Sequence, residues 1–347
     1  MALAFSRAPK SPRVAKALRF CQAKPIHGEP SRRTLEAIET FLHQDGVGEH
    51  DVYLLSHASG PEEWLNQRPE ATWLRLQAEQ SQNGKAATLA RATSYLSGEI
   101  FVVSDADMWA PPDYLSRVLA EFDDPKVGVV TCLYRSTPPR VGDWCHLFES
   151  LCILDFSASV LVARRTEGIR FAMGSTMAVR RQTLEEIGGF QALVPYLADD
   201  FQLGYRASQA GWKVALASTV LQTEPPTGAL VKALSHQYRW LVTSRVSRPG
   251  GHLAFIVTQG LFWALLWFAL SPWHGLWALV FWKLWRISHG AVQHVCLKGS
   301  WGSLWQVALL PWKDLLYLAL WFGSLRGRRV RWGERELVID TEGRIEI

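Results

Sequence analysis

Two pairs of carboxylates in this sequence have spacings that suit a chemical role. Asp105 and Asp107 follow the apolar run Ile100–Val103, separated from it only by Ser104. In an open α/β sheet, ligands bind beyond the carboxyl ends of the strands. Two carboxylates at such a place can coordinate a hard divalent cation, which in turn holds and neutralises a diphosphate. The first pair therefore predicts a Mg²⁺ or Mn²⁺ site, with a solvated turn as the alternative that a lone DxD leaves open.

The second pair, Asp199 and Asp200, opens a helical pattern that continues through Ala210. Acidic residues also suit the start of a helix for electrostatic reasons, so a capping role is the alternative. An alcohol that attacks a sugar must lose its proton as the new bond forms, and a carboxylate can accept that proton. We expect Asp200 to be this general base and Asp199 to support it.

A third candidate is the pentapeptide His236–Trp240, HQYRW. Arg239 offers a rigid fork of donors to a diphosphate, and Trp240 offers an apolar wall to an acceptor. Taken alone, these residues would be ordinary members of a surface helix.

The elements that must position these residues fall into two regimes. Residues 20–225 alternate short apolar runs with amphipathic stretches. This pattern predicts an α/β domain with a mostly parallel sheet that is covered on both faces. The expected strands are 51–55, 100–104 and 127–133, and the expected helices are 33–42 and 84–96.

The C-terminal third is apolar and rich in Trp, which favours a membrane region over a globular helical domain. The expected apolar stretches are 253–270, 276–297 and 304–325, and an amphipathic helix at 230–246 is expected to lie in the membrane interface. Clusters of Arg on both flanks of this region predict that both flanks are cytosolic. The first two stretches would then cross as a hairpin with His274 outside, and the third would be interfacial or re-entrant. Lys283 and Arg286 would have to face protein or polar groups.

Composition excludes several classes of function. The net charge of +5 is too small to indicate nucleic acid binding. The 5 Cys form no CxxC pair, so neither a zinc site nor a disulfide framework is expected, and a reducing compartment is indicated. The N-terminal residues 1–16 lack the apolar core of a signal peptide. Membrane attachment is thus expected from the C-terminal third.

The order DAD, ADD and HQYRW, followed by apolar helices, resembles family 2 glycosyltransferases with a GT-A catalytic domain. It is more similar still to the ceramide glucosyltransferase-like family 21, which includes hopanoid-associated bacterial enzymes. The resemblance implies a UDP-sugar donor, Mg²⁺ or Mn²⁺, inversion at the anomeric carbon and a lipid acceptor. The stretches that carry it are 24–28, 83–85, 155–164, 174–181, 196–200 and 236–250.

By matching position, the resemblance assigns the metal to Asp105 and Asp107 and the base to Asp200. The implied nucleotide, diphosphate and acceptor contacts are Lys85, His236, Arg239 and Trp240. Three features depart from the family pattern. No acid follows the second strand at residues 55–60, His236 stands where Gln or Arg is usual, and no spanning helix precedes the catalytic domain.

The sequence therefore predicts an inverting transferase of glucose or N-acetylglucosamine from a UDP-sugar to a hydroxyl of a ceramide-like membrane lipid. It would be an integral protein of a bacterial inner membrane with a cytosolic catalytic domain. The alternatives are an N-acetylglucosaminyltransferase acting on a hopanoid lipid and a non-catalytic membrane scaffold. The expected segments are a GT-A domain at 20–227, an interface helix at 228–250, a membrane region at 251–325, and a basic, then short tail at 326–347.

Overall fold

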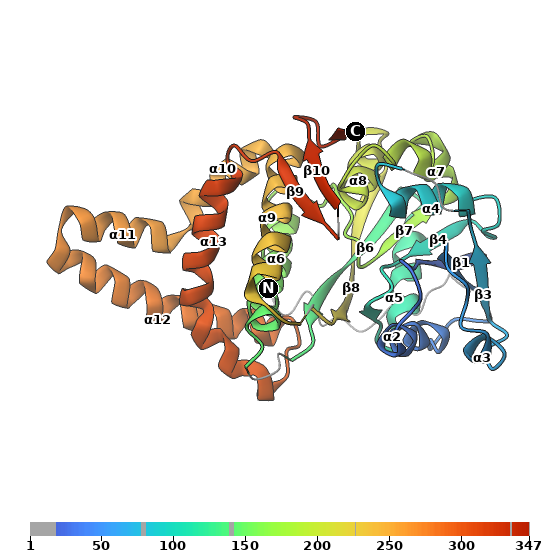
Figure 1. The fold of residues 1–347 in the computed structure, drawn as a ribbon, viewed down its shortest axis with the longest axis horizontal. Helices are drawn as coiled ribbons and strands as arrows, with labels where there is room; N and C mark the ends of the chain where they lie inside the picture. Colours follow the sequence, from blue (N-terminus) through green and yellow to red (C-terminus); the bar gives the residue numbers. More distant parts are fainter. Residues whose placement is uncertain (1–18, 78–80, 139–141, 226, 334, 347) are drawn as a thin grey trace. The chain divides into compact units, whose positions relative to one another are not determined.

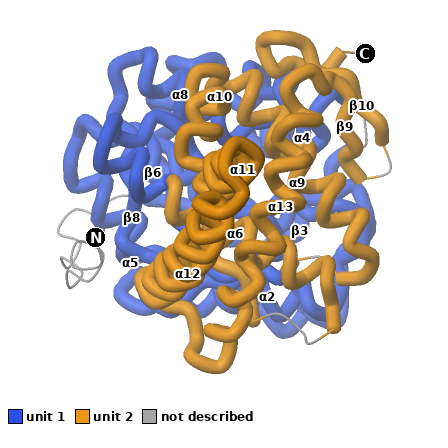
Figure 2. Tube along the Cα trace, turned by 90° about the vertical axis from the view of Figure 1, so that its left-hand side faces the viewer, with its two compact units in different colours: residues 1–134, 160–224 blue, residues 135–159, 225–347 orange. Residues whose placement is uncertain are grey.

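The computed structural model describes residues 19–77, 81–138, 142–225, 227–333 and 335–346 (Figure 1). The chain divides into two compact units, which Figure 2 colours separately. Unit 1 comprises Met1–Tyr134 and Val160–Glu224, and unit 2 comprises Arg135–Ser159 and Pro225–Ile347. Each unit is described by itself below. The N-terminal segment that was expected not to span a membrane lies outside the described residues.

Unit 1 is built on an eight-stranded sheet of order β3-β2-β1-β4-β7-β6-β8-β5. Strands β3, β2, β1 and β4 pair in parallel, whereas β7 is antiparallel to both β4 and β6, and β5 is antiparallel to β8. The α/β prediction is confirmed, but half of the sheet is not parallel, because an apolar run shows burial and not direction. The strands are β1 (Phe20–Pro25), β2 (Asp51–Ser56), β3 (Ala71–Arg75), β4 (Ile100–Val103), β5 (Met108–Trp109), β6 (Val127–Ser136), β7 (Met177–Arg180) and β8 (Lys213–Thr223).

Apart from the four-residue helix Glu62–Leu65, the helices of unit 1 each bury side chains along one face. In α2, Ala37, Ile38 and Phe41 are buried, and the side chain of Ser31 caps the first turn by accepting from the N–H of Thr34. The helices are α2 (Arg32–Leu42), α3 (Glu62–Leu65), α4 (Gly84–Ala92), α5 (Tyr114–Ala120), α7 (Arg181–Glu186) and α8 (Asp199–Gln209), with short 3₁₀ turns at Glu121–Asp123 and Phe190–Leu193. Helix α4 ends four residues earlier than the expected stretch.

The parallel strands bring their carboxyl ends to one edge of the sheet. Pro25 at the end of β1 pairs with Leu55 of β2, and Ala23 pairs with Val103 at the end of β4. The residues that follow these strands therefore emerge side by side, where ligands bind in open α/β sheets.

Unit 2 is helical and ends in a small sheet. The long helix α6 (Trp144–Thr166) begins in it, and Phe148 and Cys152 of α6 pack with Ala233 and with residues of the C-terminal helix. The other elements are α9 (Leu230–Ser247), α10 (Pro249–Thr258), α11 (Gly260–Leu270), α12 (Pro272–Cys296), the 3₁₀ segment η3 (Trp301–Leu309), α13 (Leu310–Ser324), β9 (Arg329–Trp332), β10 (Arg335–Ile339) and β11 (Ile345–Glu346). The last three form an antiparallel sheet where only a short tail was expected.

The first apolar stretch, 253–270, is not one straight helix. It is divided between α10 and α11, which bend by 53° at Gln259. By length and composition, α6 is the one single helix among the described residues that could cross a membrane, and 67% of its apolar window is buried within the protein. The bent pair would make a second candidate if it were one span.

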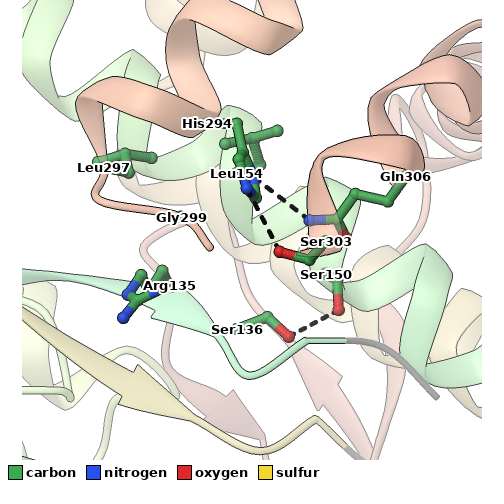
Figure 3. Close-up of a pocket in the computed structure, with 9 residues that line it drawn as sticks. All are labelled: Arg135, Ser136, Ser150, Leu154, His294, Leu297, Gly299, Ser303 and Gln306. Carbon is green, nitrogen blue, oxygen red and sulfur yellow. Dashed lines mark hydrogen bonds between the residues drawn. The ribbon is translucent and has the colours of Figure 1, made fainter. Parts of the chain in front are cut away.

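A polar cavity lies within unit 2, bordered by α6, the end of α12 and η3 (Figure 3). His294 is its central side chain. Its Nε2 donates to the carbonyl of Ser300 over 2.9 Å, and its Nδ1 accepts from the amide of Gln306 over 3.4 Å. Ser136 and Ser150 join across the cavity at 2.6 Å. This network accounts for the polar residues in an otherwise apolar stretch, because buried polar groups require partners.

Candidate active site

The first carboxylate of the DAD motif contacts a lysine. Asp105 follows β4, and its Oδ1 lies 2.6 Å from the Nζ of Lys85, in the first turn of α4. The same Nζ lies 3.8 Å from Oδ2 of Asp199. Burial alone would lower the pKa of Lys85, but the charges of Asp105, Asp199 and Asp200 outweigh burial and raise that pKa above its usual value. The structure thus joins both predicted acidic motifs around one partly buried cation.

Asp107 has a different hydrogen-bond partner from Asp105. Its Oδ2 accepts from Oγ1 of Thr223 over 3.3 Å, where β5 pairs with the end of β8. Burial and the neighbouring charge of Asp105 raise the pKa of Asp107 to about 6. A bound cation is favoured where two like charges destabilise one another.

Asp105 and Asp107 alone would supply only part of the coordination shell of a metal. No group of three or more His, Cys, Asp or Glu side chains that could hold a metal occurs among the described residues. Mg²⁺ in nucleotide sites commonly takes only one or two carboxylates and completes its shell with phosphate oxygens and water. Asp105 and Asp107 therefore suit such an ion only together with a diphosphate.

Asp199 and Asp200 occupy the first turn of α8 but are held differently. Asp199 is 7% exposed and accepts from the side-chain amide of Asn83, which also caps α4. Asp200 accepts from the N–H of Gly174 through Oδ2, over 2.8 Å, and from its own neighbour, Phe201, through Oδ1. Burial, with the charge of Asp199 adding to it, raises the pKa of Asp200 to about 6. A carboxyl that titrates near neutrality is suited to proton transfer.

Gly174 is a site residue to which sequence reasoning gave no role. Its N–H donates to Asp200, and its carbonyl accepts from the N–H of Asp105 over 3.2 Å. A Cβ at this position would lie 2.6 Å from Oδ2 of Asp105 and 3.4 Å from Nζ of Lys85. Only glycine leaves room for the two motifs to converge here. The signal available was a glycine directly before the polar pair Ser175 and Thr176, which is weak by itself.

Sequence reasoning assigned Lys24 no role beyond its place in the family-like stretch 24–28. It is fully buried, and its Nζ donates to Oγ of Ser104 over 2.7 Å and lies 3.2 Å from the ring centroid of Phe41. Burial lowers the pKa of Lys24 to about 7, although Asp105 and Asp107 oppose this shift. Lys24 therefore stabilises the loop that carries the DAD motif through its hydrogen bond to Ser104.

The place where the family usually carries an early acid is taken by a histidine. His57 follows β2, and its Nδ1 donates to the carbonyl of Leu76 over 3.1 Å while its Nε2 lies 3.2 Å from Oγ1 of Thr88. Both ring nitrogens are thus used within the protein. The imidazole therefore links the end of β2 to α4.

The HQYRW residues belong to α9 of unit 2, whereas the carboxylates belong to unit 1. The structure brings His236 and Trp240 together, with ring centroids 5.0 Å apart, and Trp240 packs against Phe156 of α6. Arg239 lies over the ring of Trp332 at 5.9 Å. Their predicted contacts with a diphosphate and an acceptor stay predictions.

The sequence comparisons agree with one another. The family model described as glycosyl transferase family 21 matches residues 68–345. A β-monoglucosyldiacylglycerol synthase of Synechocystis sp. is 29% identical over 183 residues, which is 52% of this chain and 37% of that protein. The synthase of the same name from Trichormus variabilis is 30% identical over 165 residues, 46% of this chain and 34% of that protein. The matched segments cover about a third of these relatives.

The fold comparison points the same way. A solved structure of the mannosyltransferase PcManGT from Pyrobaculum calidifontis, in complex with GDP-Man and Mn²⁺, has a TM-score of 0.53 to this chain and 19% sequence identity. The likeness covers 94% of this chain and 92% of that one. At this identity it shows a shared glycosyltransferase fold, in agreement with the GT-A prediction.

Proposed function

Because the chain belongs to glycosyl transferase family 21, we propose that it transfers a hexose from a UDP-sugar to a hydroxyl of a membrane lipid, with inversion. The observation that carries this proposal is the convergence of Asp105, Asp199 and Asp200 on Lys85 and Gly174. A cation-lined diphosphate site and a carboxylate of raised pKa are the two parts that such a transfer requires.

A divalent cation would bind to Asp105 and Asp107 and would neutralise the charge that develops on the departing diphosphate. Lys85, already beside Asp105, adds a second positive charge at the same place. These charges make UDP a better leaving group, so the chain needs no separate acid at the glycosidic oxygen.

Asp200 is the proposed base. Its two oxygens each accept one backbone N–H, and a carboxylate has further lone pairs available. These bonds fix the orientation of the carboxylate while leaving it able to accept the hydroxyl proton. The lipid oxygen then forms the new bond to the anomeric carbon, and the bond to the diphosphate breaks on the opposite face.

A lipid acceptor is supported by the surface of unit 2. Large apolar side chains are exposed along α11 and the first half of α12, which run side by side in Figure 1. Leu270 is 78% exposed, Trp273 69% and Trp277 61%. Exposed apolar surface on this scale marks a membrane or a partner, and indole is typical of membrane interfaces. The relatives are named as synthases of a glucosylated diacylglycerol, which is a lipid, and this favours the membrane.

The dimensions of this apolar hairpin, Gly260–Lys283, favour insertion into one leaflet over two crossings. Helix α11 has 11 residues, about 16 Å at 1.5 Å per residue, against a hydrocarbon core of about 30 Å. Gly260 packs against Trp282, since a Cβ there would lie 2.7 Å from that ring. Along the length of the hairpin, the start of α11 therefore lies at the same height as Lys283 of α12, which is exposed. A deeper insertion would place this ammonium in hydrocarbon, which is costly.

Arg286, one turn further along α12, meets the expectation that it faces polar groups. It is buried and paired with Asp155 and Asp314. Lys283 does not meet that expectation, because it is exposed. We therefore propose a monotopic attachment in place of the two-crossing hairpin predicted from sequence.

The experiment is transfer by the purified full-length chain in lipid vesicles, with UDP-glucose or UDP-N-acetylglucosamine as donor. Diacylglycerol, ceramide and a hopanoid alcohol are offered as acceptors, and products are read by mass spectrometry. We expect one glycolipid product that requires Mg²⁺ or Mn²⁺, and none from Asp107→Ala or Asp200→Asn. Full activity in chelator would contradict the metal assignment. A folded wild-type chain that neither binds UDP nor glycosylates any of the lipids would instead favour the non-catalytic scaffold.

A further inference from the structure

A basic segment of unit 2 connects α13 to β9 and continues into that strand. Its four arginines are all exposed, and they are Arg326, Arg328, Arg329 and Arg331. Arg328 pairs with Glu346 of β11. In the part of the chain that the structure describes, no partner is recorded for the guanidinium groups of Arg326 and Arg329. These two groups are therefore available to an anion that comes from outside the chain.

The same segment borders a groove of about 350 Å³ between α9 and β9, which lie side by side in Figure 1. Its lining residues are Ser235 and Tyr238 of α9, Arg329, Val330 and Arg331 of β9, and Glu336 of β10. Arg331 and Glu336 stand opposite one another in the ladder between β9 and β10. The acid thus offsets one of the two positive charges, and the groove keeps a net positive charge beside the hydroxyl of Ser235.

Contacts between β9 and α9 hold the groove in shape. Arg245 of α9 donates to the carbonyl of Gly327 over 2.6 Å. A Cβ at Gly327 would overlap the hydroxyl of Tyr238, so glycine is required there. Val330 is only 3% exposed, whereas the arginines on either side of it in the strand are exposed, because successive side chains of a strand point to opposite faces. The guanidinium groups are therefore presented outward by an anchored strand.

The basic segment begins at the base of the apolar hairpin, Gly260–Lys283. Leu325 packs against the apolar cluster that includes Leu261 of α11 and Trp282 of α12. Arg326 follows Leu325 directly, and four residues of chain span at most about 14 Å from Leu325 to Arg329. Headgroups extend about 5–8 Å beyond the hydrocarbon of one leaflet, and their field extends about 8 Å further at physiological salt. A leaflet that takes up the hairpin therefore places its headgroups within reach of this segment.

We propose that the groove between α9 and β9 binds the phosphate of an anionic phospholipid, such as phosphatidylglycerol, in the leaflet that holds the hairpin. Arg329 offers the phosphate a rigid fork of donors, and the hydroxyl of Ser235 is a further donor. A zwitterionic headgroup fits less well, because its own ammonium is repelled by the net positive charge of the groove. The inference rests on the membrane attachment proposed above and adds a selectivity for anionic lipid.

Binding is measured on the purified full-length chain in micelles of a neutral detergent. Phosphatidylglycerol with a fluorophore on its acyl chain is titrated, and binding is read by anisotropy. We expect saturable binding that unlabelled phosphatidylglycerol displaces and phosphatidylcholine does not. Arg329→Gln should weaken binding about tenfold, the lower end for loss of a hydrogen bond to a charged group. Arg329→Lys keeps the charge but loses the fork, so its affinity should fall between those of Arg329→Gln and the wild type.

Arg344→Gln is the matched control. It removes the same charge from an exposed side chain of unit 2 that lies outside the groove and pairs with Glu342, and it should bind the lipid as the wild type does. An equal loss of affinity in Arg329→Gln and Arg344→Gln would show a diffuse attraction without a site. Binding that does not saturate would leave β9 as a basic edge strand only. Either result would overturn the inference.

Inorganic phosphate separates a lipid from a soluble anion as the occupant. We expect it to displace the labelled lipid only weakly, because it lacks the acyl chains that pack in the micelle around the hairpin. If phosphate alone binds at Arg329 as tightly as phosphatidylglycerol, the groove takes a soluble anion and the lipid assignment is wrong.

Sugar transfer is measured on the same preparations, so that this inference and the proposed function fail separately. A wild type that transfers sugar but does not bind phosphatidylglycerol would leave the proposed function standing and the inference wrong. A wild type that binds phosphatidylglycerol through Arg329 but glycosylates none of the offered lipids would leave the inference standing and the proposed function wrong.

Discussion

Asp199 and Asp200 are adjacent carboxylates with different partners, and this difference supports the different roles that we propose for them. Asp199 is held by Asn83 and lies near Lys85, while Asp200 has both oxygens on backbone N–H groups next to Gly174. We therefore propose the first as a supporting group and the second as the base.

Asp200→Asn is therefore expected to keep donor binding and lose turnover. The amide has nearly the same shape but cannot accept the proton, so kcat should fall by roughly 10²–10⁴-fold, as is typical for loss of a general base. Asp199→Asn should keep more activity. The two variants are compared by steady-state kinetics and by UDP binding. Equal residual activity in both would mean that the base has not been identified.

The raised pKa of Asp200 also has a consequence for stability. Its pKa of about 6 in the folded protein exceeds the value of about 3.9 for an unfolded Asp. Between these values the folded state binds more protons than the unfolded state, so this group makes stability decrease as pH rises from about 4 to about 6. Asp107 also makes stability decrease as pH rises, because its pKa is raised in the folded protein as well.

We expect the difference in Tm between Asp200→Asn and the metal-free wild type to grow in favour of the variant as pH rises from 5 to 7. The uncharged amide does not carry the cost of ionisation in a buried site. Thermal unfolding at a series of pH values measures this difference. Mn²⁺ should raise the Tm of the wild type more at pH 7 than at pH 5, because protons compete for Asp107. A difference in Tm that does not change with pH would show that Asp200 is already ionised without cost.

At the scale of elements, sequence patterns were most informative where burial alone defines an element. The runs at 51–55, 100–104 and 127–133 are strands, and the two acidic motifs fall at a strand end and a helix start as expected. Their convergence could not be anticipated, because Asp199 and Asp200 open α8 and do not follow a parallel strand. The antiparallel course of β7 could not be anticipated either, since an apolar run has no direction.

Two residues of the site could not be recognised from the sequence for a different reason. Gly174 matters through the Cβ that it lacks, and Lys24 matters through a hydrogen bond to Ser104, 80 residues away. A single lysine in a short strand has no periodicity that would mark it. Such residues become visible only once the chain has folded around them.

A buried ionic cluster joins three helices of unit 2. Arg286 of α12 bonds to Asp155 of α6 and to Asp314 of α13, at 2.5 and 2.7 Å, and Lys313 bonds to the same two carboxylates at 2.5 and 2.8 Å. The cluster is neutral in sum. Removing one member of such a set leaves charges buried without compensation, and this is more costly than the gain from making the set.

Asp314→Ala should therefore destabilise unit 2 by about 3–5 kcal/mol. Glu342→Ala, which removes an exposed partner of Arg344 in the same unit, is the matched control and should cost less than about 1 kcal/mol. Trp fluorescence during denaturant unfolding reports on unit 2, where Trp is concentrated. A loss for Asp314→Ala as small as for the control would mean that water screens the cluster.

At the scale of the whole molecule, the question is how the chain is attached to a bilayer. The basic flanks of the helical region meet within unit 2, where Arg245 of α9 donates to the carbonyl of Gly327 ahead of β9. The two flanks therefore lie on the same side of the helical region, and the cytosolic location of that side stays a prediction. Insertion of the apolar hairpin into one leaflet and crossing by two spans both satisfy that condition, so the position of the hairpin tip must distinguish them.

The tip is formed by Ser271 and His274, which bond to one another at 2.9 Å. We expect a cysteine at His274, in a Cys296→Ser background, to be inaccessible to an impermeant maleimide from the side opposite the catalytic unit. The other four cysteines are buried. An environment-sensitive fluorophore at the same site should report an apolar surrounding and be quenched by brominated acyl chains. A cysteine at exposed Lys283 should react with maleimide added on the side of the catalytic unit, because Lys283 lies at the base of the hairpin. Labelling of the His274 site from the opposite side would restore the two-crossing hairpin and exclude monotopic insertion.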